Sequence, residues 1–227
     1  MSTKKLIEGF ERFRRKNYET GTLMEKLAQN GAHPDFFIIN CIDPRNGADL
    51  VFDAEPGQQF IHSQMAAIIP PYTPGNEPET SASLSYAIDS KKIKHLIIMG
   101  HSECGGCQAL VDGTSDHYID SWVKTAEQAK KTAQAKVGTN DNNLLWRETE
   151  RQVLIMSYQN IIEYPMVKQA LKEGRLTVSA WLFDLKQGTL NEYDAATKTF
   201  KQLNILPSRK GQRPQASNKL QPPGFAA

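Results

Sequence analysis

Two short stretches of the sequence combine side chains that can bind a metal ion. The first is Gly100-His101-Ser102-Glu103-Cys104-Gly105-Gly106. Imidazole nitrogen and thiolate sulfur are both good zinc ligands. The stretch follows a buried apolar run at 95–99, and we expect it to open a helix. His101 and Cys104, three residues apart, would then share one helix face. Two ligands do not complete a zinc site, so at least one more must come from elsewhere.

The second stretch begins at Cys41, which ends the apolar run 36–41. A run that is apolar on both faces is typical of a parallel strand buried between layers of helices. Sites in open parallel sheets form outside the carboxyl ends of the strands. If the strands that precede Cys41 and His101 are neighbours, Cys41, His101 and Cys104 converge. Two thiolates and an imidazole bind zinc and leave one tetrahedral position free, as a catalytic zinc requires.

Asp43 and Arg45 follow Cys41 at alternate positions, so in an extended loop they point the same way as Cys41. Asp43 has two possible roles beside a zinc ion. It can bind the metal as a fourth ligand and close the site. Alternatively, it can pair with Arg45, turn away, and accept a hydrogen bond from the water that the zinc activates. The planar fork of Arg45 suits the second role, because it can hold a carboxylate with two bonds.

A competing interpretation uses Cys104 and Cys107 as a Cys-x-x-Cys pair at a helix start, the setting of a thiol–disulfide oxidoreductase. It leaves Cys41, His101 and the Asp43–Arg45 pair without a purpose. Cys107 would lie on a different helix face from His101, so we expect it to be a packed free thiol. The four remaining histidines are expected to be ordinary polar or loop residues: His33, His62, His95 and His117.

Composition limits the classes of protein to consider. The chain has 227 residues, of which 39% are hydrophobic and 23% charged, which suits one soluble domain with a real core. A net charge of +2 is too small to indicate nucleic acid as a partner. No apolar run reaches the roughly 20 residues that span a bilayer, and the N-terminal pattern does not fit a signal peptide. Three cysteines are too few for a disulfide framework, so we expect a cytoplasmic protein.

Strands and helices alternate along the sequence, which predicts a single α/β domain: a mostly parallel central sheet flanked by helices. We expect strands at 36–41, 59–62, 94–99, 176–185 and 190–193. Helices are expected at 3–18, 22–31, 81–91, 121–136, 144–163 and 165–174, the second with a Thr22–Glu25 capping box and the third capped by Thr80. The predicted divisions are a helical arm at 1–34, a zinc-binding catalytic domain at 35–206 and a loose tail at 207–227. The apolar faces of the arm must cover the sheet or a second subunit.

Taken together, these residues resemble the β-class carbonic anhydrases. The resemblance covers roughly residues 35–195. Its motifs are Cys41-Ile42-Asp43-Pro44-Arg45, Pro56-Gly57-Gln58-Gln59-Phe60, Ile69-Pro70-Pro71-Tyr72, the segment 80–87 and Met99-Gly100-His101-Ser102-Glu103-Cys104-Gly105-Gly106. Further matches lie at Asn160, Tyr164, Pro165, Val167, Gly174, Leu176, Trp181, Asp184 and Gly188.

The resemblance implies one zinc ion per subunit, bound by Cys41, His101 and Cys104, with Asp43 as a reversible fourth ligand held off by Arg45. It also implies a homodimer or homotetramer in which the N-terminal helices pack on a partner subunit. The implied reaction is reversible hydration of carbon dioxide to bicarbonate and a proton. Zinc promotes this reaction by lowering the pKa of bound water, so that hydroxide is available as the nucleophile.

One segment departs from the family pattern and leaves other functions open. Ser63-Gln64-Met65-Ala66-Ala67 stands where the family usually has Arg-Asn, then Ala or Gly, then Asn. Ser179 likewise replaces a common histidine. A reshaped entrance would suit a hydrolase of carbonyl sulfide or carbon disulfide. A non-enzymatic zinc- or bicarbonate-binding protein, with Asp43 kept on the metal, is the third possibility.

Overall fold

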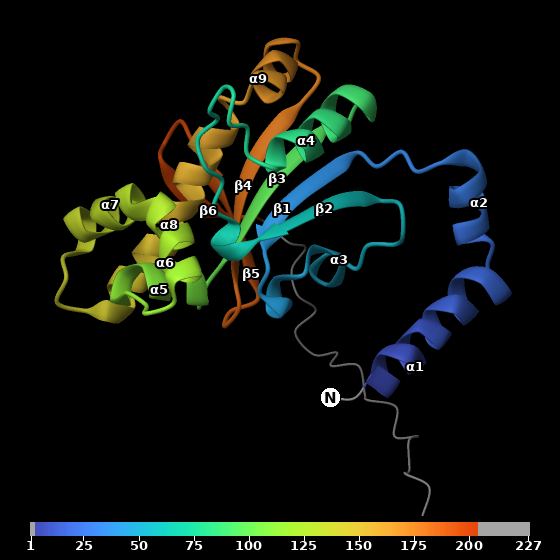
Figure 1. The fold of residues 1–227 in the computed structure, drawn as a ribbon, viewed down its shortest axis with the longest axis horizontal. Helices are drawn as coiled ribbons and strands as arrows, with labels where there is room; N and C mark the ends of the chain where they lie inside the picture. The colour runs from blue at the N-terminus through green and yellow to red at the C-terminus, as the bar shows by residue number, and fades with distance from the viewer. Residues whose placement is uncertain (1–2, 204–227) are drawn as a thin grey trace, which may run out of the picture.

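The structure is a computed structural model that describes residues 3–203 (Figure 1). The predicted tail at 207–227 lies outside the described residues. A six-stranded sheet in the order β2-β1-β3-β4-β5-β6 runs through the described part of the chain. Its strands are β1 (Phe36–Cys41), β2 (Gln59–Gln64), β3 (His95–His101), β4 (Thr177–Asp184), β5 (Thr189–Asp194) and β6 (Thr199–Gln202).

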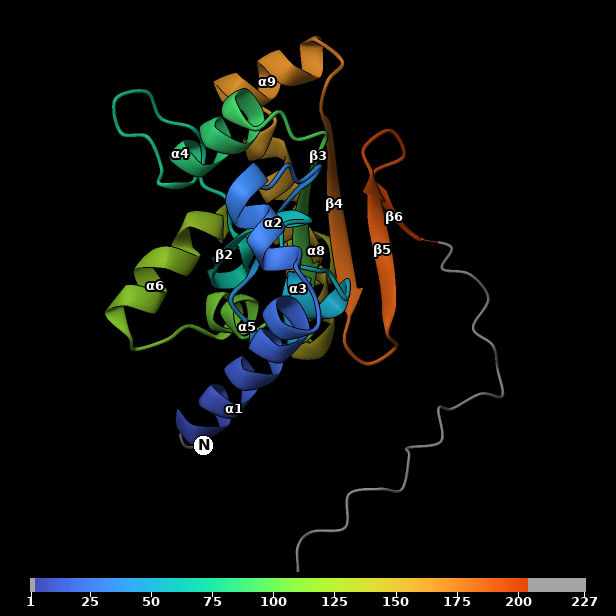
Figure 2. The ribbon, with the colours of Figure 1, turned by 90° about the vertical axis from the view of Figure 1, so that its right-hand side faces the viewer.

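The sheet is parallel across its first four strands and antiparallel at one edge. β1 pairs in parallel with both β2 and β3, and β3 pairs in parallel with β4. The antiparallel edge is the meander β4-β5-β6, seen edge-on in Figure 2. The predicted strands are all present, and β6 is an additional strand that the sequence analysis did not predict. The expected α/β fold with a mostly parallel sheet is confirmed.

Helices cover the two faces of the sheet unequally. Alternate side chains of β1 and β3 point to opposite faces: Ile39 and Ile98 pack in the main core, which α4, α8 and α9 help to form, whereas Ile38 and Ile97 pack in a smaller cluster with Ala48 of α3. A further group of helices lies beyond the carboxyl ends of the strands (Figure 1). The helices of the domain are α3 (Ala48–Val51), α4 (Thr80–Ser85), α5 (Gly105–Asp112), α6 (His117–Val123), α7 (Glu127–Val137), α8 (Asn142–Ile161) and α9 (Pro165–Lys172).

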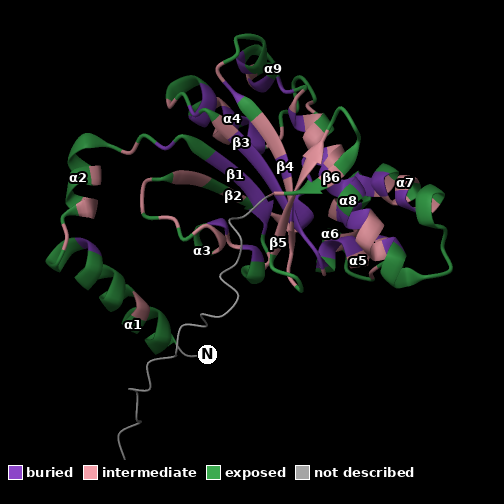
Figure 3. Ribbon diagram, turned by 180° about the vertical axis from the view of Figure 1, so that it is seen from behind, coloured by how far each residue is buried: buried purple, intermediate pink, exposed green. Residues whose placement is uncertain are grey.

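The N-terminal arm stands off the sheet (Figure 1). It consists of α1 (Thr3–Arg14), a π-helical turn at Arg15–Glu19 and α2 (Leu23–Asn30). Neither α1 nor α2 has a buried residue, and both are largely exposed in Figure 3, whereas β1 and β3 are mostly buried. The predicted helices exist, but the side chain of Thr22 makes no cap hydrogen bond, so the expected capping box does not form.

Three other details of the sequence prediction are wrong. The single helix expected at 121–136 is two helices, α6 and α7, separated by a 3-10 turn at Lys124–Ala126. The segment after β3 does not open a helix at residue 100. β3 continues to His101, a short loop follows, and α5 begins only at Gly105. The predicted cap Thr80 is instead the first residue of α4, which continues into a π-helical turn at Tyr86–Ser90. Within residues 3–203, no helix combines the length and apolar character needed to cross a bilayer.

Candidate metal centre

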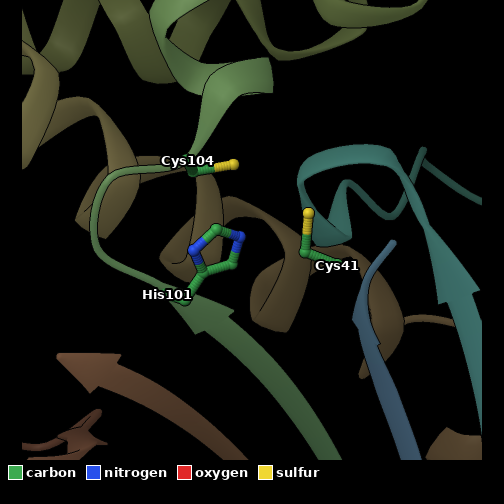
Figure 4. Close-up of side chains that lie close together, drawn as sticks. All are labelled: Cys41, His101 and Cys104. Carbon is green, nitrogen blue, oxygen red and sulfur yellow. The ribbon is translucent and has the colours of Figure 1, made fainter. Parts of the chain in front are cut away.

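Three metal-binding side chains meet beyond the carboxyl ends of β1 and β3. Cys41 and His101 are the last residues of these paired parallel strands, and Cys104 lies just before α5. Their ligand atoms, two sulfurs and an imidazole nitrogen, all lie within 4.8 Å of one another. Figure 4 shows the two thiols and the imidazole ring gathered around one space. The structure therefore brings together, from two segments distant in the sequence, the three side chains that the sequence singled out.

His101 has one ring nitrogen occupied and one available. Its Nδ1 atom lies 2.8 Å from the carbonyl oxygen of Ser102, which can only accept a hydrogen bond, so Nδ1 carries the proton. The Nε2 atom is buried and has no hydrogen-bond partner within the part of the chain that the structure describes. A buried, unpartnered polar atom costs free energy. A metal ion at this position would give Nε2 a partner, and a backbone carbonyl that accepts from the other ring nitrogen is typical of metal-binding histidines.

The two thiols are buried, and their environment sets their protonation. A hydrogen bond with Cys104, together with burial, raises the pKa of Cys41. A hydrogen bond with Cys107 raises the pKa of Cys104, and burial acts in the same direction. Both groups are therefore neutral thiols without a metal. A bound divalent cation reverses this preference, because a coordinating thiol is deprotonated outright.

The donor set fits zinc. Zinc binds sulfur at about 2.3 Å and histidine nitrogen at about 2.0–2.1 Å, so ligand atoms on a tetrahedral ion lie roughly 3.5 Å apart. A separation of at most 4.8 Å closes to this value with side-chain shifts of about 1 Å. Three protein ligands leave the fourth position of the tetrahedron for water or substrate.

Asp43 lies beside the three ligands but is held by Arg45. Its Oδ1 atom accepts hydrogen bonds from the backbone N–H and from Nε of Arg45, each at 2.9 Å, and its Oδ2 atom accepts one from Nη2 at 2.7 Å. Hydrogen bonding to Arg45 lowers the pKa of Asp43 to about 2. The Oδ2 atom lies 3.9 Å from Nε2 of His101. Of the two roles considered for Asp43, this arrangement is the one in which the carboxylate pairs with Arg45.

Two buried asparagines hold the loop that carries Asp43, and the sequence analysis missed both. The side-chain amide of Asn40 donates to the carbonyl oxygens of Cys41 (2.9 Å) and Asn46 (2.8 Å). The amide of Asn46 donates to the carbonyl oxygen of Met99 in β3 at 3.2 Å. These bonds tie the end of β1 to the strand that delivers His101. An asparagine inside the apolar run 36–41 was the available signal, because a buried polar side chain needs a partner.

The segment that departs from the family pattern forms part of the wall around the ligands. Ser63 donates its hydroxyl to Oδ1 of Asn40 at 2.8 Å, so this serine supports the asparagine network. Ala66 and Ala67 have left-handed backbone conformations, with φ of 58° and 51°. Trp122 supports them by donating its indole N–H to the carbonyl oxygen of Met65 at 3.0 Å. Ala66 packs in one buried cluster with Cys41 and Cys104, which keeps that side of the centre apolar.

Other candidate residues lie outside the centre. Cys107 is buried in the same apolar cluster, and it is not among the three grouped ligands. All three cysteines, which lie within residues 3–203, are free thiols, as expected for Cys107. The side chain of His62 lies 3.4 Å from Glu79, and His95 contacts Thr177 at the opposite end of β3.

Comparisons with known proteins identify relatives of this arrangement. The family model described as carbonic anhydrase matches residues 36–190. A carbonic anhydrase of Pseudomonas aeruginosa is 28% identical over 198 residues, covering 86% of this chain and 89% of the relative. The structure of the β-carbonic anhydrase CcaA superposes with a TM-score of 0.81 at 25% identity, covering 90% of this chain and 93% of that chain.

A third comparison concerns the fold. Structures described as two tetrameric β-carbonic anhydrases from the filamentous ascomycete Sordaria macrospora include a chain that superposes with a TM-score of 0.67 at 21% identity. The superposition covers 89% of this chain and 94% of that chain. At this identity the likeness shows a shared fold.

Proposed function

Because this chain belongs to the carbonic anhydrase family, zinc enzymes that hydrate carbon dioxide reversibly, we propose that Cys41, His101 and Cys104 hold its zinc ion, one per subunit. The observation that carries this assignment is the buried Nε2 of His101, unpartnered among the described residues and grouped with two buried thiols. When bound, zinc supplies a Lewis acid that lowers the pKa of a water molecule, so that this water can attack carbon dioxide near neutral pH.

Asp43 orients the attacking water in this proposal. With a pKa of about 2, its carboxyl group is ionised at neutral pH, so it accepts a hydrogen bond and is too weak a base to keep the proton. The proton therefore leaves to a buffer or to a group on the protein surface. Arg45 occupies both oxygens of Asp43, which orients the carboxylate and keeps it from becoming a fourth ligand.

A hydration assay tests the proposed function directly. Stopped-flow measurements across pH 7–9 on protein with measured zinc content should show turnover that disappears when zinc is removed and returns when it is restored. Carbonyl sulfide and carbon disulfide are assayed in parallel, because the segment 63–67 departs from the family pattern beside the ligands. Turnover of a sulfur substrate without carbon dioxide hydration would indicate the hydrolase instead. Stoichiometric zinc without any turnover would indicate a binding protein.

We also propose that the protein is a homodimer or homotetramer in which the arm packs on a partner subunit. The support is the apolar face of α1, where Leu6 is 72% and Phe10 60% exposed. Large apolar side chains gathered on one exposed face mark an interaction surface. A cytoplasmic location belongs to the same proposal, because three unpaired cysteines suit a reducing compartment.

A further inference from the structure

The loop Ser102–Cys104 joins two of the proposed zinc ligands and is held at both ends. The backbone N–H of Ser102 donates to the carbonyl oxygen of Phe183, and the Ser102 hydroxyl oxygen accepts from the N–H of Leu185, each at 2.9 Å. The N–H of Cys104 donates to Oε1 of Glu150 in α8 at 2.9 Å. The loop is therefore anchored to β4 on one side and to α8 on the other.

Glu103, between these anchors, has a backbone conformation that requires support. Its φ is +59°, in the left-handed region, which is strained for a residue with a Cβ atom. This conformation is accompanied by a contact at the site: the Glu103 carbonyl oxygen accepts a hydrogen bond from Nη2 of Arg45 at 3.1 Å. The same Nη2 donates to Oδ2 of Asp43. The loop therefore helps to hold the arginine that holds Asp43.

Arg147 connects two carboxylates of this region, those of Glu103 in the loop and Glu150 in α8. On α8 its Nη2 atom lies 2.9 Å from Oε1 of Glu150, and its Nη1 atom lies 3.1 Å from Oε1 of Glu103, an ion pair that lacks hydrogen-bond geometry. Glu150 is only 4% exposed, so its charge needs a partner. Lys186 also contacts Glu103, at 2.7 Å, but this lysine side chain is 74% exposed, and such pairs contribute little. Of these two cationic side chains, only Arg147 contacts both Glu103 and Glu150.

We infer that Arg147 is a positioning residue of the metal centre. By joining Glu150 to Glu103, it holds the loop 102–104 in the conformation that directs the Glu103 carbonyl toward Arg45. Arg45 thereby keeps Asp43 turned away from the metal position, and Glu150 fixes the backbone of Cys104. A lysine could not do the same, because it lacks the planar fork that reaches two carboxylates. This inference rests on the zinc site proposed above.

The test compares Arg147→Ala and Arg147→Lys with Arg151→Ala. Arg151 is a matched control, because it lies one turn along the same helix and its Nη1 pairs only loosely with Glu148, at 3.6 Å. Two readouts are independent of turnover: the rate at which zinc passes from the holoenzyme to a chromophoric chelator, and the visible spectrum of the cobalt(II)-substituted protein. Carbon dioxide hydration, resolved into kcat and KM, is measured on the zinc-loaded proteins.

We expect Arg147→Ala to bind one zinc per chain but to lose it about 10- to 100-fold faster, the usual effect of removing a group that orients metal ligands. Its cobalt spectrum should change and its kcat should fall, with Arg147→Lys lying between it and the wild type. Arg151→Ala should match the wild type in all three measurements. If Arg147→Ala does not fold, Arg147→Lys carries the test through the same readouts.

Arg147 variants that equal Arg151→Ala in zinc release and cobalt spectrum would overturn the inference, whatever their activity. Failure of the wild-type protein to bind zinc would be a different result, because it would remove the proposed metal site itself. The two failures are therefore distinguishable.

Discussion

The Oδ2 atom of Asp43 lies 3.9 Å from Nε2 of His101, so the carboxylate stands beside the nitrogen that would bind the metal ion. Arg45 holds this carboxylate with hydrogen bonds to both of its oxygens. The Asp43–Arg45 ion pair therefore decides whether the fourth position of the metal stays open or is closed by Asp43.

Replacing Arg45 tests that dependence. Arg45→Ala should retain one zinc per chain, because none of the three grouped ligands is changed. Hydration should fall by about 10- to 100-fold, because Asp43 becomes free to occupy the fourth position. Arg45→Lys should be intermediate, since an ammonium cannot hold both oxygens. Metal analysis with stopped-flow assays checks the outcome, and full activity in Arg45→Ala would contradict the role given to the pair.

Zinc binding should release protons. Cys41 and Cys104 are neutral thiols in the metal-free protein because their pKa values are raised, and zinc binds them as thiolates. Two protons are therefore displaced, and apparent affinity should rise by about 100-fold per pH unit between pH 7 and 8. Competition with a chelator of known pH dependence measures this slope. Cys41→Ser should give a smaller slope and weaker binding, whereas affinity that does not depend on pH would exclude the two-thiol site.

Gly106 and Ala66 should be energetically coupled. A Cβ atom added at Gly106 would lie 2.9 Å from the Cβ of Ala66, whose own φ is positive. Gly106→Ala should lower the free energy of unfolding by about 1–3 kcal/mol through overpacking. Ala66→Gly should raise it by up to about 1 kcal/mol, because glycine adopts this conformation without strain.

The double variant decides whether the two effects share a cause. Removing the Cβ of Ala66 leaves only the looser contact with Met65, at 3.4 Å, so Ala66→Gly should recover part of the loss in Gly106→Ala. Denaturant unfolding of all four proteins forms a double-mutant cycle. Strict additivity would show that the close approach is relieved elsewhere.

The raised pKa of Tyr164 should make the free energy of unfolding depend on pH in the alkaline range. Burial raises its pKa to about 12, and its hydroxyl donates to the carbonyl oxygen of Pro70 at 2.9 Å. An unfolded tyrosine ionises near pH 10, so above that pH the unfolded state has lost the proton that the folded state retains. The free energy of unfolding should therefore fall between pH 10 and 12, by at most about 2–3 kcal/mol from this residue.

The comparison with Tyr164→Phe isolates this contribution. The phenylalanine variant should be less stable than the wild type by about 1 kcal/mol at pH 8, because the hydrogen bond is lost. The difference should shrink or reverse as the pH approaches 12. Parallel stability curves for the two proteins would show that Tyr164 ionises equally easily in both states.

The apolar face of α1 should govern assembly. Leu6→Ser combined with Phe10→Ser removes two exposed apolar side chains one turn apart, and it should reduce the molar mass measured by light scattering. Lys5→Ser combined with Arg12→Ser is the matched control, because it alters charged positions of the same helix and should leave the mass unchanged. An unchanged mass in the first variant would place the subunit contact elsewhere.

Much of this molecule follows from sequence patterns with a simple physical basis. Runs that are apolar on both faces predicted β1 and β3, and the rule that parallel sheets collect sites at their carboxyl ends predicted that Cys41 would meet His101. The spacing of His101 and Cys104 was misjudged as helical. A three-residue spacing is equally compatible with a strand end followed by a loop, and the loop depends on the left-handed conformation of Glu103, which no local propensity favours.

The contacts between distant residues that hold the site could not be predicted from local sequence patterns. Glu150 lies 46 residues from Cys104 along the chain. One signal did exist, because Glu150 shares a helix face with Val153, Leu154 and Ser157, all buried, and a charged residue on such a face needs a partner. The sequence could not show which partner, since that depends on how α8 crosses the end of the sheet. β6 was missed because its four residues alternate too briefly to stand out.

Two of the three proposed ligands, Cys41 and His101, end adjacent strands and lie 60 residues apart in the chain, which has a consequence for biogenesis. A polypeptide emerging during synthesis presents a single soft donor until the segment containing His101 has also been made. The complete set of three side chains can therefore form only after β1 and β3 have paired.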